Sequence, residues 1–425
     1  MGRWGDTGKD FYSSFDWDEV HLSLIETLED KGDKGDKGDK GDKGDKEDRG
    51  FLVYLIRAQT SIRVEGVGVV LDVAIIGAGV AGLTCAQQLR QAGYKVVVLE
   101  KSRGVGGRMA TRRIEETCAD HGVRYLEPQG TFLPSLIESL SDRGILKVWT
   151  DTVYEFNSSF SSSHSPFPRY VAPTGMTAVA KFLATGLDIW LNQRVEAIAP
   201  TEAQAWYLTL NSPDHTHHGL RAKAIVIAIP APQALMLVEP LTQAGLSSVF
   251  LNSLRSVEFN PCISVIAGYP VQRQHDLEQL NPGWKSLSVL EDTDLAWIGL
   301  DSSKRPDAIS PVFVLQSTAK FAQSYSDATD LQPAGHRLLS HAAQLVIPWL
   351  NSPDWMQVHR WRYAFPQTPL NQDCLATTTP LPLVCCGDWC GGNLIESAIN
   401  SGFVAAVKIN HHLRQLPLPV KSFKF

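Results

Sequence analysis

The residues of this chain whose spacing most clearly implies chemistry are three glycines in the G-x-G-x-x-G pattern of a dinucleotide-binding turn. They are Gly77, Gly79 and Gly82. The apolar run at residues 73–76 predicts a buried strand before them, and residues 80–89 predict a helix after them. Such a turn brings the backbone close to a pyrophosphate, while N–H groups at the helix N-terminus face the anion. We expect the intervening Ala78 and Ala81 to lie at the same ligand.

A second predicted strand, at residues 95–99, ends in Glu100, where an acid can hydrogen-bond the ribose of an adenosine. A carboxylate at this position disfavours a 2′-phosphate, so we exclude NADP from this site. Lys101 follows directly and is assigned to the same site. A glycine-rich turn without a ligand is the alternative, and the agreement of strand, helix and acid weighs against it.

Two further segments carry groups suited to a phosphate and a sugar alcohol. Gly107 and Arg108 combine close backbone approach with a charge-assisted clamp on a pyrophosphate, and a solvent-facing turn is the alternative. Near the C-terminus, Gly387 and Asp388 follow an apolar run, where the carboxylate can accept a hydrogen bond from a sugar-alcohol hydroxyl.

A helix is predicted at residues 394–413, with Asn393 as its N-cap and Glu396 at capping-box spacing. The positive end of this helix would stabilise the anion that forms on the pyrimidine side of a reduced flavin, by about 1 kcal/mol. This helix therefore favours a flavin as the ligand.

Composition narrows the class of protein. The chain has 425 residues, 44% of them hydrophobic, which is enough for two lobes around a large core. A net charge of −6 offers no general attraction for nucleic acid or anionic lipid. No apolar run approaches the roughly twenty residues that span a bilayer, and the first residues lack a signal-peptide core. The seven cysteines, an odd number without framework spacing, suit a reducing compartment, so we expect a cytoplasmic protein.

No metal site is predicted. Cys385 and Cys386 are adjacent in a predicted strand and should point to opposite faces, which disfavours zinc. Three histidines, His215, His217 and His218, fall in a turn-rich segment between two predicted strands, and a solvated hairpin loop is the better interpretation.

The chain divides into a leader and a body of the α/β class. Residues 1–70 include five copies of Lys-Gly-Asp, which cannot bury apolar area, and are predicted to be a disordered low-complexity leader. The body is predicted to be a Rossmann-like three-layer domain, discontinuous in sequence, with a second α+β substrate lobe. The first domain takes residues 71–150, 185–235 and 375–415. The substrate lobe takes residues 151–184 and 236–374.

Taken together, these segments resemble the flavin amine oxidase superfamily and, within it, the renalase-like proteins. The resemblance rests on the motif at residues 72–113 and on GDWCGGNLIESAINSGFVAA at residues 387–406. Shorter segments follow in the same order between them: ADHGVRYL (119–126), RYVAPTGMTAVAKFLA (169–184), AIVIAIPAPQAL (224–235), LAWIGLDSSKRP (295–306) and HRWRYA (359–364).

The resemblance implies FAD laid across the first domain, a substrate lobe above the flavin ring, and oxidase chemistry. By motif match, Glu100 takes the ribose, Arg108 the pyrophosphate side and Asp388 the ribityl chain. The main chain of Val195 takes the adenine, and Ile395 and its neighbours supply backbone donors to the flavin. No cysteine matches the one that monoamine oxidases use for covalent attachment, so noncovalent FAD is expected.

The substrate is expected to be a small molecule held against the flavin by aromatic walls. The candidate side chains are Trp297, Trp361, Tyr363, Tyr269, His121 and Trp389, and we select His121 and Trp389 as the catalytic candidates. Relatives commonly carry a glutamine where this chain has Arg124, so the chain departs from the family pattern at this expected substrate contact.

The renalase resemblance implies oxidation of non-standard dihydronicotinamide isomers, which need no base, with dioxygen as acceptor. An amine oxidase, a polyene desaturase or isomerase, and a non-catalytic flavin-stabilised binding protein are the alternatives. The sequence leaves the oligomeric state open.

Overall fold

A computed structural model describes residues 70–425, except 115–116, 158, 214–217, 281–282, 393, 421–422 and 424–425. The predicted disordered leader, apart from Val70, lies outside the described residues. No helix within the described part of the chain is long and apolar enough to cross a membrane.

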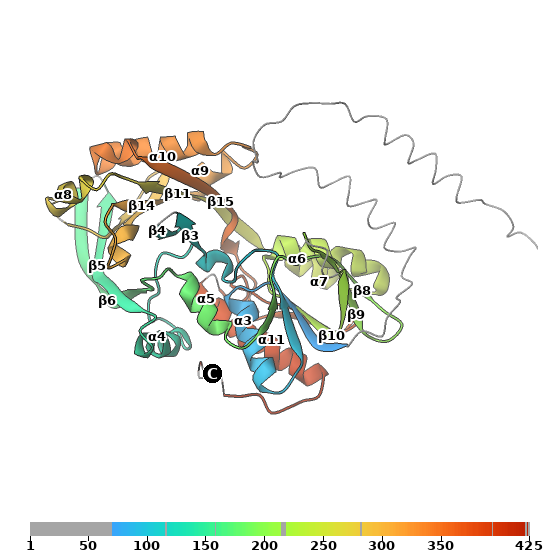
Figure 1. Ribbon diagram of the computed structural model, residues 1–425. Helices are drawn as coiled ribbons and strands as arrows, with labels where there is room; N and C mark the ends of the chain where they lie inside the picture. Colours follow the sequence, from blue (N-terminus) through green and yellow to red (C-terminus); the bar gives the residue numbers. More distant parts are fainter. Residues whose placement is uncertain are drawn as a thin grey trace, which may run out of the picture. The chain divides into compact units, whose positions relative to one another are not determined.

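The strands that follow the leader build an eight-stranded sheet (Figure 1). Its main path runs through β16 (Leu375–Thr377), β17 (Leu383–Cys385), β10 (Gly219–Ile227), β1 (Leu71–Ile76), β2 (Val96–Leu99) and β7 (Asp188–Trp190). The strands from β17 to β7 pair in parallel, while β9 (Trp206–Asn211) pairs antiparallel with both β10 and β8 (Arg194–Pro200). This sheet confirms the predicted α/β class, and the β9–β10 pairing confirms the predicted hairpin.

Helices cover both faces of this sheet, as the continuous apolar run of β1 requires. Val73 and Ile75 face a core shared with α3 (Val80–Gln91) and α11 (Ile395–His412), which pack against each other (Figure 1). Ala74 and Ile76 face the opposite core, with α6 (Ala231–Val238) and α7 (Ser248–Arg255). Cys386 belongs to the first core and Cys385 to the second, which confirms that they point to opposite faces.

A second, seven-stranded sheet lies beside the first in the same unit. Its order is β15 (Trp355–Thr368), β11 (Glu258–Gly268), β14 (Val312–Ser317), β13 (Leu295–Leu300), β12 (Ser286–Val289), β5 (Lys147–Asn157) and β6 (Ser159–Val171). Every neighbouring pair is antiparallel except β12 with β5. The short strands β3 (Thr111–Ile114) and β4 (Thr117–Asp120) pair only with each other and form a separate two-stranded sheet.

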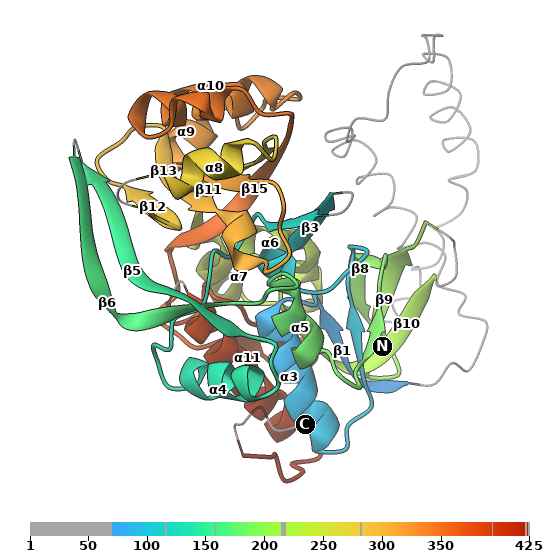
Figure 2. The ribbon, with the colours of Figure 1, turned by 60° about the vertical axis from the view of Figure 1, so that its left-hand side comes forward.

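The two faces of the second sheet have different partners. Ile263 and Val265 of β11 pack with α9 (Ala319–Gln323) and α10 (Gln332–Leu345), the helices that cover one face in Figure 2. The alternate residues Ser264 and Ile266 point the other way. Ser264 donates a hydrogen bond to the carbonyl of His121, and Ile266 joins the core of the first sheet. The second face is therefore turned toward the dinucleotide-binding half.

The predicted domain boundaries stay a prediction, and the packing bears on two segments that were assigned to the substrate lobe. Helix α5 (Thr177–Leu183) contacts α3 and shares its core, and α7 contacts α6. Both helices thus lie with the first sheet. The remaining helices are α4 (Leu133–Asp142) and α8 (Arg273–Glu278), and short 3-10 turns occur at η1 (Gly107–Met109), η2 (Glu239–Ala244), η3 (Asp301–Lys304) and η4 (Pro348–Asn351).

Candidate functional site

The glycine turn has the geometry of a dinucleotide site. Gly77 has a positive φ of 106°, and a Cβ there would lie 2.7 Å from the Ala228 carbonyl oxygen. A Cβ on Gly82 would lie 2.1 Å from the carbonyl oxygen of Gly77, so this glycine allows the helix to approach the strand. Gly79 is the N-cap of α3, has no side chain to cap the helix, and has open space where a Cβ would stand. An anion therefore fits against the first turn of α3.

The residues between and after these glycines are buried and fixed. Ala78 is fully buried, and its carbonyl accepts a hydrogen bond from Gly106, at 2.9 Å. Ala81 is buried within α3. Gly107 is exposed, and a Cβ on it would lie 3.7 Å from the Cα of Gly79. The two glycine segments thus face each other across the expected position of the pyrophosphate.

Glu100 stands at the end of β2, as predicted. Its side chain is buried, and its two carboxylate oxygens accept hydrogen bonds from Ala78 N–H and Ser102 N–H, each at 2.9 Å. Each oxygen has a further lone pair, so these bonds orient the carboxylate and leave capacity for ribose hydroxyls. The Glu100 carbonyl accepts from Gln193 N–H at 2.9 Å, which brings the start of β8 and the buried Val195 beside this carboxylate. Lys101 is exposed.

Arg108 and Asp388 form a bidentate ion pair that sequence reasoning did not anticipate. Nη2 lies 2.6 Å from Oδ1 and Nη1 lies 2.7 Å from Oδ2, and Nη1 also donates to the Ala364 carbonyl at 3.0 Å. Gly387, beside Asp388, donates its N–H to Ser401 of α11 at 3.0 Å. Arg108, which is predicted to bind the pyrophosphate, and Asp388, which is predicted to bind the ribityl chain, thus bind each other. Together these bonds connect β15 and the C-terminal segment to the first domain.

The N-terminus of α11 differs from the prediction. The N-cap is Leu394, which provides no side-chain cap, so the predicted N-cap at Asn393 is wrong. Asn393 itself lies outside the described residues. Glu396 caps a different helix, because its carboxylate accepts hydrogen bonds from the N–H groups of Thr131, Phe132 and Leu133 at the start of α4. The first N–H groups of α11, from Ile395 onward, are left without a side-chain cap, as backbone donors to a ligand must be.

His121 follows β4 and lies against the second sheet. It is 5% exposed, and its ring centroid is 5.0 Å from that of His359 and 5.2 Å from that of Trp361. Its Nδ1 has no hydrogen-bond partner among the described residues. Burial lowers the pKa of His121 to about 3, and His359 and Arg112 act in the same direction. The imidazole is therefore neutral at physiological pH.

Trp389 lies in a different environment. It is fully buried, its Nε1 donates to the Ile229 carbonyl at 3.1 Å, and its ring belongs to the core that α6 and α7 cover. These contacts fix the turn that carries Asp388. They give the indole no access to a substrate, so its catalytic role stays a prediction without support from its surroundings.

The aromatic candidates separate by sheet face. Tyr269 is 2% exposed, donates to the Leu350 carbonyl at 2.7 Å and belongs to the core under α10, away from the candidate site. His359, Trp361 and Tyr363 alternate along β15 and are only partly buried. His359 and Trp361 share the face of β15 against which His121 packs, and the ring of Tyr363 lies 5.6 Å from that of Phe259.

Four buried charges lie next to His121, a cluster that no sequence motif indicated. Asp120 and Asp301 face Lys304 and Arg305, with Lys304 Nζ 2.7 Å from Asp301 and 3.3 Å from Asp120, and Arg305 Nη2 3.0 Å from Asp120. Burial alone would raise the pKa of Asp120, but Lys304 and Arg305 hold it below its ordinary value. We call this cluster the buried charge network. It fixes the β3–β4 hairpin to η3 and thereby positions His121.

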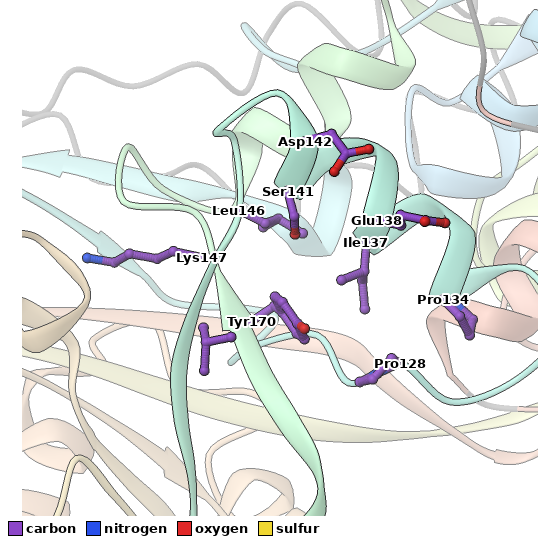
Figure 3. Close-up of a pocket in the computed structure, with 10 residues that line it drawn as sticks. Pro128, Pro134, Ile137, Glu138, Ser141, Asp142, Leu146, Lys147 and Tyr170 are labelled. Carbon is purple, nitrogen blue, oxygen red and sulfur yellow. The ribbon is translucent and has the colours of Figure 1, made fainter.

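A separate surface pocket lies between α4 and the start of β5, and Figure 3 shows residues that line it. Its volume is about 460 Å³. Pro134, Ile137 and Leu146 supply apolar lining, and Glu138 and Asp142 lie on α4 beside it. None of its lining residues belongs to the glycine turn, the Arg108–Asp388 pair or the surroundings of His121. This pocket is therefore not part of the candidate site.

Comparison with known proteins agrees with this geometry. Residues 75–137 match the profile of the NAD(P)-binding Rossmann-like domain. Over 69 residues the chain is 38% identical to putrescine oxidase of Kocuria rosea, and over 153 residues it is 29% identical to the flavin-dependent L-tryptophan oxidase RebO of Lentzea aerocolonigenes. The first match covers 16% of this chain and 14% of the relative, and the second covers 31% of each. The chain thus spans less than a third of the length of these curated relatives.

Solved structures show the same fold over a larger part of the chain. A putrescine oxidase bound to putrescine superimposes with a TM-score of 0.59 at 15% identity, covering 81% of this chain and 99% of the other. Cyclohexylamine oxidase from Brevibacterium oxydans superimposes with a TM-score of 0.59 at 14% identity, covering 81% of this chain and all of the other. The profile of the flavin containing amine oxidoreductases matches residues 145–410, more than half of the chain. The chain therefore belongs to the flavin-containing amine oxidoreductase family.

Proposed function

We propose that this enzyme is a renalase-like oxidase that takes a hydride from a small substrate, with dihydronicotinamide isomers reduced at the 2- or 6-position as the substrate and dioxygen as the acceptor. When bound, FAD accepts the hydride and returns two electrons to dioxygen, which leaves with two protons as hydrogen peroxide. The ring nitrogen of a dihydronicotinamide drives hydride release, so this substrate needs no base.

The observation that carries this proposal is the electrostatic state of His121. An effective general base has a pKa near the working pH, and the pKa of His121 is lowered to about 3. Its neighbours His359, Trp361, Ser264 and Gly122 provide no carboxylate. Among the described groups around His121, the carboxylates are those of the buried charge network, where Lys304 and Arg305 pair them. A substrate that needs no base therefore suits this site.

Amine oxidation is the second candidate, since relatives named for amines share the fold. The partly exposed His359, Trp361 and Tyr363 could flank a neutral amine. A dication such as putrescine is disfavoured, because Arg124 places an unpaired positive charge on the same sheet face. The polyene alternative has no observation in its favour.

FAD is proposed to be held noncovalently. Covalent attachment would need a reactive cysteine thiolate, and Cys374 is a cysteine in the C-terminal part of the chain. Cys374 is buried, and burial raises the pKa of its thiol to about 11, so its thiolate is scarce at neutral pH. Acid precipitation should therefore leave a colourless pellet and free FAD in the supernatant. A yellow pellet would contradict noncovalent binding and leave the fold assignment intact.

Anaerobic mixing tests the substrate. The isomers reduced at the ring 2- or 6-position should bleach the flavin absorbance far faster than putrescine or cyclohexylamine, and admitted oxygen should restore it with release of hydrogen peroxide. If these isomers leave the flavin oxidised while an amine or a polyene reduces it, the renalase-like activity is wrong.

A further inference from the structure

Arg124 is a cation whose end groups lack a protein partner. It is partly buried, its Nε donates to Gln316 Oε1 at 2.6 Å, and its guanidinium carbon lies 4.9 Å from the ring centroid of Trp297. No described residue accepts a hydrogen bond from Nη1 or Nη2, and neither atom is among the fully buried unpartnered ones. Solvent therefore reaches these two donors, and they remain available to a ligand.

The positive charge of Arg124 is uncompensated among the described residues. Burial lowers the pKa of Arg124, and the nearby Arg169 lowers it further. Arg169 is itself paired with Glu127 at 3.3 Å, so that carboxylate is already engaged. Tyr125 and Cys262 act in the opposite direction, but burial raises the pKa of both, so they are neutral at physiological pH. A cation that is partly removed from water is stabilised when an anion pairs with it.

The surroundings hold Arg124 in one orientation. Gln316 is 2% exposed, accepts from Nε, and donates its own Nε2 to the Gly122 carbonyl at 2.8 Å. Trp297, which lies under the guanidinium, is 1% exposed, and its Nε1 is buried without a partner. Trp297, Gln316 and Ser264 are also direct neighbours across β13, β14 and β11. Nη1 and Nη2 of Arg124 are thus preorganised. The indole N–H of Trp297 beside them also lacks a hydrogen-bond acceptor.

The same short segment connects Arg124 to the FAD site. His121 precedes Arg124 by three residues, and Val123 between them donates its N–H to the Arg108 carbonyl at 2.9 Å. Arg108 in turn holds Asp388. An anion paired with Arg124 would therefore belong to a molecule that also reaches the surroundings of His121.

We propose that Arg124 binds an oxyanion of the substrate, either a carboxylate or a phosphate, through Nη1 and Nη2. The planar fork of a guanidinium matches both groups. This inference rests on the proposed function and adds that the hydride donor is anionic. It predicts that a nucleotide is preferred to its nucleoside, or an amino acid to its amine.

Binding without turnover provides the sharpest test. Titration of the FAD-loaded protein with two matched pairs, benzoate with benzamide and nicotinamide mononucleotide with nicotinamide riboside, can be followed by the change in flavin absorbance. The anionic member of at least one pair should bind at least tenfold more tightly. The pair that shows the difference identifies the carboxylate or the phosphate as the group recognised.

Two variants decide whether Arg124 is responsible. Arg124→Gln can keep the hydrogen bond to Gln316, and it should reduce the preference for the anion to within twofold while the protein keeps its FAD. Arg113→Gln removes an exposed arginine from the neighbouring hairpin and should leave the preference intact. Arg124→Lys should restore part of the preference, because it returns the charge without the fork.

The outcomes separate this inference from the proposed function. Equal affinities within both pairs in the wild-type protein, or an unchanged preference in Arg124→Gln, would overturn the role of Arg124, whichever hydride donor reduces the flavin. A lower melting temperature of ligand-free Arg124→Gln would also overturn it, since a recognition residue with an uncompensated charge should not stabilise the free fold. Failure of the dihydronicotinamide isomers with the anion preference intact would instead overturn only the proposed substrate.

Discussion

Replacing Lys304 with methionine tests whether the buried charge network holds the structure around His121. Lys304 is fully buried, 2.7 Å from Asp301 and 3.3 Å from Asp120. The substitution leaves Arg305 as the single partner of the Asp120 and Asp301 carboxylates. Removing one partner of a buried ion pair lowers the free energy of unfolding by about 3 to 5 kcal/mol. For about 350 ordered residues the entropy of unfolding is about 0.7 kcal/mol per kelvin. The melting temperature should therefore fall by about 4 to 7 °C.

The size of this loss should depend on pH. Burial raises the pKa of Asp301 and Asp120 adds to the rise, while Lys304 opposes it, so Lys304→Met should raise the pKa further. A carboxyl group with a raised folded-state pKa contributes stability below its unfolded pKa of about 3.9, and this contribution is lost as the pH rises through the folded value. The difference between wild type and variant should therefore be largest near neutral pH and shrink as the pH falls toward 5.

The assay is thermal unfolding of the FAD-loaded proteins, followed by circular dichroism between pH 5 and 8. Lys320→Met, which removes an exposed lysine, serves as the matched control. The double variant Lys304→Met with Asp301→Asn leaves one buried pair, Asp120 with Arg305, so its loss should be smaller than the sum of the two single losses. A fall of less than about 1 °C, or a loss independent of pH, would refute the view that these four groups are charged and sealed from water.

Three further substitutions address the FAD site and His121. Glu100→Ala should weaken FAD binding about ten- to a hundredfold, because it removes a hydrogen-bonded charge worth about 1.5 to 3 kcal/mol. Fluorescence titration of the apoprotein measures this, and an unchanged affinity would contradict the role of Glu100 at the ribose. Gly82→Ala should purify with little FAD, because the added Cβ would stand 2.1 Å from the carbonyl oxygen of Gly77, and full flavin content by absorbance would contradict this. His121→Gln should leave the pH dependence of flavin reduction unchanged between pH 5 and 9, because the pKa of His121 is about 3, and a lost inflection would show that it titrates there.

The parts of the fold set by local pattern could be predicted from the sequence. The strand, turn and helix around Gly77 follow from an apolar run, a glycine spacing and a helical period, all within about twenty residues. The predicted strand at residues 95–99 agrees with β2 (Val96–Leu99) to within one residue. The predicted helix at residues 394–413 exceeds α11 (Ile395–His412) by one residue at each end. In each case the signal lies in neighbouring residues.

The parts that could not be predicted depend on pairs distant in sequence. Arg108 and Asp388 are 280 residues apart, and Asp120 and Lys304 are 184 residues apart. Each of these residues is an ordinary charged side chain when read in its own segment. The wrong prediction of the N-cap of α11 has the same origin. Glu396 stands at capping-box spacing, but its carboxylate accepts hydrogen bonds from the start of α4, more than 260 residues away in sequence. Local pattern does not contain this information.

The two arginines that flank His121 show how tertiary pairing separates positioning from recognition. The sequence assigns Arg108 to the cofactor and Arg124 to the substrate contacts, but it does not show which of the two is paired with a carboxylate. Arg108 is paired with Asp388 at 2.6 Å, so its charge is compensated without a ligand and it holds the C-terminal segment, while its contact with the pyrophosphate stays a prediction. Arg124 has a hydrogen bond to a neutral amide and no carboxylate among the described residues. A fold that keeps a preorganised cation unpaired tolerates a loss of stability there, and a bound anion would offset that loss.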